Sequence, residues 1–189
     1  IPMMDYRDTS LTPKERAKAL LSRMSLEQKV AQLQCRMFNG DVQHFLDADE
    51  YGVGELAMAS PAQTAKASAQ LNRAAIDAVM AKTGGIPPVL ETEAISGFMA
   101  VESTSFPSGS AMASTFDPDG MRGMTDIIRR QMLSQGVRRA CSPVMDVSRD
   151  PRWGRVGETY GEDPTLAAAM GTAFVQGLQS EHPEDGVAA

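Results

Sequence analysis

The residues best suited to chemistry are concentrated between Cys141 and Pro164, in the segment CSPVMDVSRDPRWGRVGETYGEDP. This segment contains three arginines, three aspartates, two glutamates and the only tryptophan of the chain. A guanidinium held in place by carboxylates can donate paired hydrogen bonds to a polar ligand. One hypothesis is that one arginine faces such a ligand. The alternative is an ion-pair network that only stiffens a long loop, with these members: Arg149, Arg152, Arg155, Asp146, Asp150, Glu158, Glu162 and Asp163.

Trp153 lies in the middle of this charged segment. Its indole ring could form a platform for a sugar, or it could be an apolar plug beneath the loop. Of these two roles, we favour the plug.

The charged segment follows a predicted strand. Three short apolar runs have the length of buried parallel strands: Gly54–Ala59, Ile86–Leu90 and Arg139–Val144. In parallel α/β folds, ligands bind at the carboxyl ends of the strands. The connection from Asp146 to Asp163 leaves the third strand at that edge and runs about 18 residues, where about 2–6 are usual.

Helices are expected between these strands. Four residues suited to the N-cap each precede a proline, which fits the first helical position: Thr12, Ser60, Asp117 and Asp163. Glu15, Gln28 and Gln63 complete capping boxes with Thr12, Ser25 and Ser60. The first helical stretch divides into Pro13–Met24 and Leu26–Cys35. Alternating strands and helices predict an α/β fold with a parallel sheet.

The number of units predicts a partial barrel. We count three or four βα units, and residues 186–189 resemble the opening of another strand. A (β/α)₈ barrel needs eight units over about 250 residues. We therefore expect residues 1–189 to form a single incomplete domain that stops in mid-fold.

Composition excludes several classes of function. The net charge of -6 and the absence of a basic stripe argue against nucleic acid as a partner. No apolar run approaches the length of a membrane span, and no signal peptide is present in this sequence, so the compartment stays open. We predict that Cys35 and Cys141 are buried free thiols. Cysteine and histidine are too sparse for a zinc site, and no metal or cofactor is expected.

Four segments, in order, resemble glycoside hydrolase family 3, the β-glucosidase and β-xylosidase family. They are YRDTSLTPKERAKALLSRMSLEQKVAQL, IPPVLETEAISG, FPSGSAMASTFDPDGM and SPVMDVSRDPRWGRVGETYGEDP. The resemblance implies the N-terminal portion of a (β/α)₈ TIM-type catalytic barrel, which in this family is usually followed by a second α/β domain.

The resemblance also implies a sugar site. Arg155 matches the family arginine that hydrogen-bonds sugar hydroxyls, and Glu93 matches the acidic residue of the motif acid-Ala-x-His-Gly. Asp146, Arg152, Trp153 and Glu158 are expected to surround these residues. The histidine of the motif is Ser96 here, which puts one sugar contact in doubt. Position 93 is often Asp in glucosidases, and the longer Glu favours a pentoside.

No residue of this chain matches the family's nucleophile or acid/base, which lie beyond Ala189. The implied activity is hydrolysis of terminal β-linked glucose or xylose with retention, by the complete protein. The substrate would be a β-linked oligosaccharide or aryl glycoside, and the remainder of the barrel would be a partner. We expect residues 1–189 alone to be inactive. The alternative is a non-catalytic carbohydrate-binding or interaction module. The β-N-acetylhexosaminidase branch is disfavoured, because its typical Asp-Gln-Glu-Gly-Gly segment is ETEAISG here.

Overall fold

One parallel sheet organises the chain. The computed structural model describes residues 5–43, 47, 49–60, 62 and 64–189. The strands lie in the order β1-β2-β3-β4, with all pairs parallel. Their bounds are β1 Cys35–Met37, β2 Glu55–Ala57, β3 Val89–Thr92 and β4 Arg139–Ala140.

The sheet is wound in one direction. Next to β4, Ala188 pairs in parallel with Arg139, and its N–H donates to the carbonyl of Arg138 at 2.9 Å. Spatial order therefore follows chain order as far as Ala188. A doubly wound sheet reverses its order, whereas a (β/α)₈ barrel does not. The predicted fold class, the N-terminal portion of a barrel, is confirmed.

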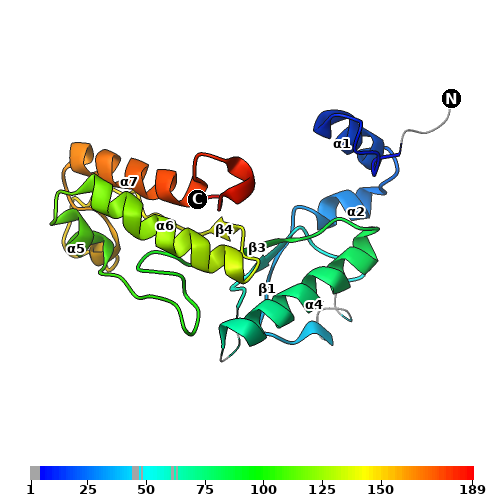
Figure 1. Cartoon of the computed structure of the whole chain (residues 1–189), viewed down its shortest axis with the longest axis horizontal. Coiled ribbons are helices and arrows are strands. Elements are labelled where there is room, and N and C mark those ends of the chain that lie inside the picture. Colours follow the sequence, from blue (N-terminus) through cyan, green and yellow to red (C-terminus); the bar gives the residue numbers. More distant parts are fainter. Residues whose placement is uncertain (1–4, 44–46, 48, 61, 63) are drawn as a thin grey trace.

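Helices α4, α6 and α7 pack against one side of this sheet. The bounds of the described helices are α1 Pro13–Leu21, α2 Leu26–Ala31, α4 Ala65–Thr83, α5 Gly109–Ala113, α6 Pro118–Ser134 and α7 Pro164–Gln179, with short 3₁₀ turns η1 Val156–Glu158 and η2 Pro183–Asp185. Helices α6 and α7 lie side by side at one end of the molecule, and α1 lies at the other (Figure 1). None of the helices in the described part of the chain combines the length and apolar character needed to cross a bilayer.

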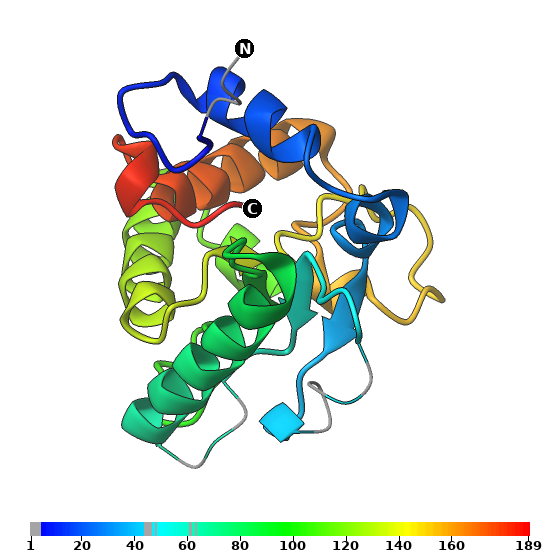
Figure 2. The same ribbon diagram turned by 90° about the vertical axis from the view of Figure 1, so that its right-hand side faces the viewer.

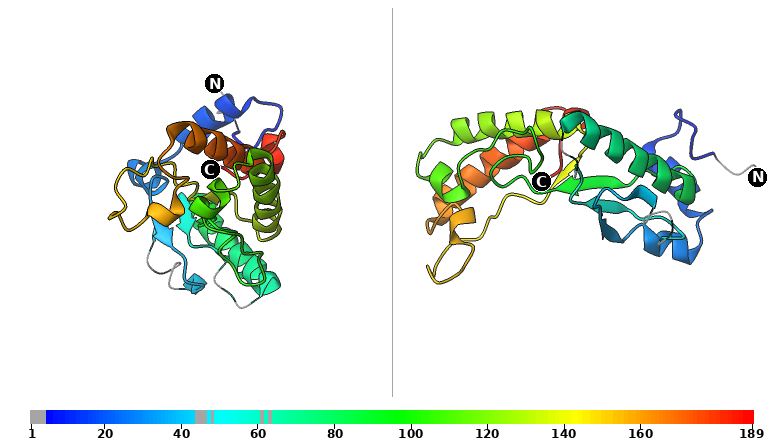
Figure 3. Two further views of the ribbon diagram at one scale, coloured as in Figure 1. Left: turned by 90° about the vertical axis from the view of Figure 1, so that its left-hand side faces the viewer. Right: turned by 90° about the horizontal axis from the view of Figure 1, so that it is seen from below.

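Successive side chains along each strand point to opposite faces of the sheet. Leu56, Leu90 and Ala140 are buried in the core that the strands share with α4, α6 and α7. Glu55, Glu91 and Arg139 alternate with them and therefore point to the opposite, inner face. The loop from 141 to 163, drawn yellow to orange, runs on the side of the strands away from α4 (Figures 2 and 3).

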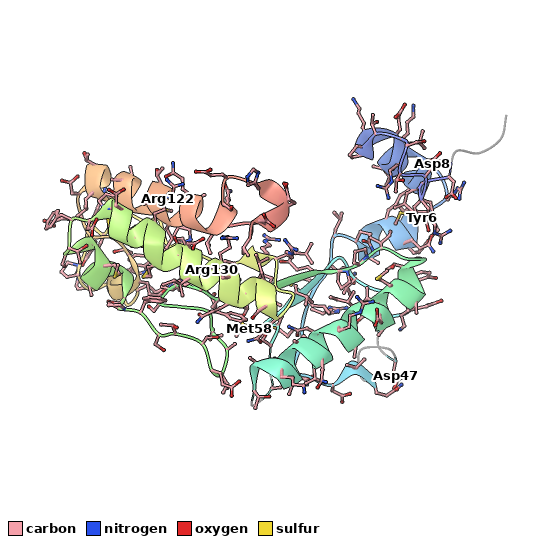
Figure 4. All side chains as sticks on the ribbon, viewed as in Figure 1. Tyr6, Asp8, Asp47, Met58, Arg122 and Arg130 are labelled. Carbon is pink, nitrogen blue, oxygen red and sulfur yellow. The ribbon has the colours of Figure 1, made fainter. Side chains whose placement is uncertain are left out.

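Most predicted helix starts are confirmed. Thr12 and Ser25 cap α1 and α2 in complete capping boxes with Glu15 and Gln28. Asp117 and Asp163 cap α6 and α7, each before a proline. Tyr6 ties the N-terminal segment to the end of α4, because its hydroxyl donates to the carbonyl of Gly84 at 2.6 Å (Figure 4).

One predicted helix start is wrong. Helix α4 begins at Ala65 with Thr64 as its N-cap, not at Ser60. Ser60 is buried, and its N–H donates to Oδ1 of Asn72 at 3.1 Å. The Oγ of Ser60 accepts from Nδ2 of Asn72 at 3.0 Å, so this hydroxyl binds Asn72 and does not cap the start of a helix. Pro61 and Gln63 lie outside the described residues.

Strand positions also needed correction. The predicted helix Leu26–Cys35 ends at Ala31, and Cys35 begins β1, since it pairs with Glu55 of β2. The predicted strand Ile86–Leu90 is β3, which starts at Val89 rather than Ile86, because Pro87 and Pro88 have no N–H to donate to a neighbouring strand.

Candidate functional site

Glu93 and Cys141 directly follow β3 and β4 at the carboxyl edge of the sheet. Two hydrogen bonds fix the backbones here. The N–H of Cys141 donates to the carbonyl of Thr92 at 3.0 Å, and the N–H of Ala94 donates to Oγ of Ser142 at 3.0 Å. The two strand ends are therefore held side by side at the edge where parallel α/β folds bind ligands.

The turn after Glu93 is closed on itself. The N–H of Met99 donates to the carbonyl of Glu93 at 3.0 Å, and that of Phe106 donates to Ser96 at 2.8 Å. Gly97 has a φ of 117°, and a Cβ there would lie 2.3 Å from the carbonyl oxygen of Thr104. Only glycine fits this position without a shift of the backbone, so the turn holds Glu93 in a defined place.

The side chain of Glu93 carries an unused acceptor. Its Oε2 is buried and has no hydrogen-bond partner among the described residues. A buried polar atom without a partner costs free energy, and most such atoms in proteins are paired. An unpaired carboxylate oxygen at the ligand-binding edge indicates a site for an external donor.

Arg155 sits where the long loop turns into η1. Its Nε donates to both carboxylate oxygens of Glu158, at 3.1 and 3.0 Å, and its Nη2 donates to Oε2 at 2.6 Å. Nη1 makes no hydrogen bond to the described part of the chain. The pKa of Arg155 is raised, first by the bond to Glu158 and to a smaller extent by the charges of Glu93 and Asp146. The guanidinium is thus oriented by one carboxylate and lies within electrostatic range of two others.

Helix α5 supports this turn. Oγ of Ser110 donates to the carbonyl of Gly157 at 3.1 Å. A Cβ on Gly109 would lie 2.3 Å from the carbonyl oxygen of Glu158, so α5 and η1 are in direct backbone contact. The N–H of Ser148 donates to the carbonyl of Gly161 at 2.9 Å and closes the loop behind Arg155.

The loop contains two local ion pairs rather than a network. Arg152 pairs with Asp150, with Nη2 and Oδ2 2.6 Å apart, and Arg155 pairs with Glu158. Asp163 is used as the cap of α7. No ion pair is found for Arg149, Asp146 or Glu162 within the described residues. The predicted network is therefore wrong, because residues two or three positions apart are close enough to pair with each other.

The predicted plug is also wrong. The side chain of Trp153 is exposed, since the residue is 39% exposed. Its backbone N–H donates to the carbonyl of Asp150 at 3.1 Å. The chain turns back tightly at this point, which leaves the indole at the surface. The platform role of Trp153 stays a prediction.

Sequence reasoning missed a polar cluster on the inner face: Cys35, Glu55, Glu91 and Arg139. One side-chain atom from each of the first three lies within 4.8 Å of the others, a spacing that could hold a metal ion. Nη1 of Arg139 donates to both oxygens of Glu55 at 2.9 Å, so Glu55 already has a cationic partner. The period of two in ETE predicts that Glu91 and Glu93 share a face, and this signal could have found Glu91.

Cys35 and Cys141 are exposed, so their predicted burial is wrong. Cys35 in β1 and Cys141 directly after β4 have the register of residues that point to the inner face. The pKa of each thiol is raised, first by partial burial and then by the charge of Glu55 on Cys35 and of Glu93 on Cys141.

Comparisons with known proteins agree with the fold. A β-glucosidase structure from Erythrobacter marinus has a TM-score of 0.87 and 35% identity, covering 97% of this chain and 26% of that one. A mutant β-glucosidase from Listeria innocua in complex with laminaribiose has a TM-score of 0.78 and 28% identity, covering 94% and 26%. A periplasmic β-glucosidase/β-xylosidase from Dickeya chrysanthemi is 30% identical, over 93% of this chain and 30% of its own length.

This chain thus spans roughly a quarter to a third of the length of these relatives. The family model described as the glycosyl hydrolase family 3 N-terminal domain matches residues 25–189, which is most of the chain. Together with the parallel sheet wound in one direction, this match shows that the chain belongs to glycosyl hydrolase family 3.

Proposed function

We propose that this chain supplies part of the sugar-binding site of a glycosidase that removes terminal β-linked glucose or xylose residues. The observation that carries the proposal is the buried, unpaired Oε2 of Glu93 at the carboxyl edge of the sheet. The names of the relatives, which include β-glucosidases and a β-glucosidase/β-xylosidase, support this class of substrate.

In this proposal the two charged groups contact sugar hydroxyls from different elements. Glu93 accepts hydrogen bonds from hydroxyls at the end of β3, and Arg155 donates to hydroxyl oxygens from the long loop. Bonds to charged groups are roughly twice as strong as neutral ones, which suits a ligand made mostly of hydroxyls. Glu158 orients the guanidinium of Arg155, and the negative charge of Asp146 favours the charged form of that guanidinium. The exposed Trp153 offers a platform for a sugar ring.

The chemistry itself is not assigned to Glu93 or Asp146. Retaining hydrolysis uses two carboxyl groups about 5–5.5 Å apart, one that attacks the sugar and one that donates a proton to the leaving group. We propose that both lie in the remainder of the complete protein and act through a covalent glycosyl-enzyme. The residues of this chain would then bind and orient the sugar that those groups attack.

The test replaces Arg155 in the full-length protein by Ala and by Lys. Loss of a charged hydrogen bond should lower kcat/KM on aryl β-xylosides and β-glucosides roughly 10- to 150-fold. Lys should restore little, because an ammonium cannot reproduce the planar fork. Arg130→Ala, a variant on the exposed face of α6 (Figure 4), is the control and should behave like wild type.

Two results would contradict the proposal. Near-normal kinetics of both Arg155 variants would reduce Arg155 to a loop strut. A full-length protein that binds these glycosides without hydrolysing them would support the non-catalytic binding module instead.

A further inference from the structure

Cys141 lies next to Glu93 on the inner face of the sheet. The register of β3 and β4 pairs Glu91 with Arg139 and Thr92 with Ala140, so Glu93 and Cys141 come next. Neighbouring strands are about 4.8 Å apart, and side chains at paired positions on one face are close enough to touch. The backbone bonds of Cys141 to Thr92 and of Ala94 to Ser142 hold this register on both sides of the pair.

The thiol of Cys141 stays protonated at neutral pH. Partial burial raises its pKa first, and the negative charges of Glu93 and Glu91 raise it further. A protonated thiol is a weak donor, whereas a thiolate could not donate at all. The raised pKa therefore keeps the Cys141 thiol in the form that can donate to the carboxylate of Glu93.

Glu93 has two carboxylate oxygens with different surroundings. Oε2 is buried and has no partner among the described residues. A glutamate side chain has several rotatable bonds, and fixing them costs free energy unless a contact does so beforehand. A neighbour that binds the carboxylate without using Oε2 would orient this oxygen toward a ligand.

We propose that Cys141 is a positioning residue for Glu93: its thiol donates to the carboxylate and leaves Oε2 free for a sugar hydroxyl. This inference rests on the proposed function, since it assumes that Glu93 contacts the sugar. The proposal also predicts that activity depends more on the hydrogen that the thiol donates than on the volume of the side chain.

The experiment compares two substitutions of opposite kind in the full-length protein. Cys141→Ser keeps a donor, and Cys141→Val fills the space without one. We expect Val to lower kcat/KM on an aryl β-xyloside about 3- to 10-fold, as for loss of one weak hydrogen bond, and Ser to stay within about 2-fold of wild type. In a Glu93→Ala background, which has no side-chain acceptor, Val should cause less than about a 2-fold further loss, because the hydrogen bond that it removes is already absent.

Controls separate the possible failures. Cys35→Val changes the other inner-face cysteine, which is level with Glu55 and Val89 at the far end of the strands, and should leave kinetics unchanged. Thermal unfolding of each variant checks that the fold is kept. If Val matches wild type while Ser loses activity, Cys141 is a packing residue and the inference is overturned. If Glu93→Ala itself is fully active, the proposed sugar contact fails, and the inference fails with it.

Discussion

Glu93 reaches one methylene further from the end of β3 than an aspartate would. In the proposed site, that extra length occupies space near the position where a hexose carries its hydroxymethyl group and a pentose carries hydrogen. We therefore expect the full-length protein to prefer an aryl β-xyloside to the matching β-glucoside. One methylene or methyl-sized group in a pocket changes specificity roughly 10- to 200-fold.

Glu93→Asp tests this expectation. The shortened side chain should raise the glucoside-to-xyloside ratio of kcat/KM by roughly 10-fold, even if both rates fall. Arg155→Lys is the control, because it should lower kcat/KM for both substrates without changing the ratio between them. An unchanged ratio in Glu93→Asp would place sugar selection elsewhere.

Glu91 should make stability depend on pH. Its pKa is raised, first by partial burial and then by the charges of Glu55 and Glu93, against an opposing effect of Arg139. The folded state therefore holds the carboxyl proton of Glu91 more tightly than the unfolded chain does. For this reason, Glu91 stabilises the fold at pH values below the ordinary glutamate pKa. That contribution is lost as pH rises through the raised folded pKa.

The substitution Glu91→Gln removes this ionisation. The unfolding temperature of the full-length protein should rise at pH 7.5 relative to wild type and should not rise at about pH 4. Glu15→Gln is a control of opposite sign, since hydrogen bonds from Thr12 lower the pKa of Glu15. A Glu91→Gln variant that is equally destabilised at both pH values would mean that Glu91 contributes by packing or hydrogen bonding instead.

At the scale of elements, the contact between α5 and η1 places Arg155. A Cβ on Gly109 would lie 2.3 Å from the carbonyl oxygen of Glu158 and 3.1 Å from that of Thr159. Gly109→Ala should therefore push η1 away and displace the guanidinium that begins this turn. A misplacement of about 1 Å can cost roughly 100-fold in rate, so we expect kcat/KM to fall by at least about 10-fold.

The matched control for this prediction lies in η1 itself. A Cβ on Gly157 would meet nothing within 4 Å, so Gly157→Ala should stay within about 3-fold of wild type. Steady-state kinetics on the full-length variants and their unfolding temperatures check both. Equal behaviour of the two alanine variants would remove α5 from the positioning of Arg155.

Helix starts could be predicted from the sequence better than strands could. Thr12 and Ser25 satisfy N–H groups within three residues, so their caps are local signals. Strands of two to four residues exist through partners far along the chain, which is why β1 falls within a predicted helix. The same limit applies to the site. The pairing register of β3 and β4 brings Cys141 beside Glu93, and the fold of the long loop exposes Trp153. Neither feature follows from the sequence pattern around the residue itself.

At the scale of the whole molecule, α4, α6 and α7 cover one side of the sheet, and the loop from 141 to 163 runs on the other side (Figure 3). Large apolar side chains are exposed along α2 and β1: Leu26 is 72% exposed, Leu33 87% and Met37 70%. Leu26 lines a hollow of about 490 Å³ beside residues 49–52. Strand β1 pairs only with β2 among the described residues and so presents a free edge. Exposed apolar surface next to an unpaired edge favours association.

Residues 1–189 expressed alone should therefore associate and should hydrolyse nothing. Within the described residues, Glu55 and Glu91 are close together, but Arg139 binds Glu55, and Glu91 lies two residues deeper than Glu93 along β3. We expect no release of p-nitrophenol from aryl β-glycosides and oligomers in light scattering. Leu33→Lys should reduce association, whereas Phe116→Lys, which is also largely exposed but lies between α5 and α6, should not. Turnover by this piece that Glu91→Gln abolishes would instead place the chemistry on the inner face of this sheet.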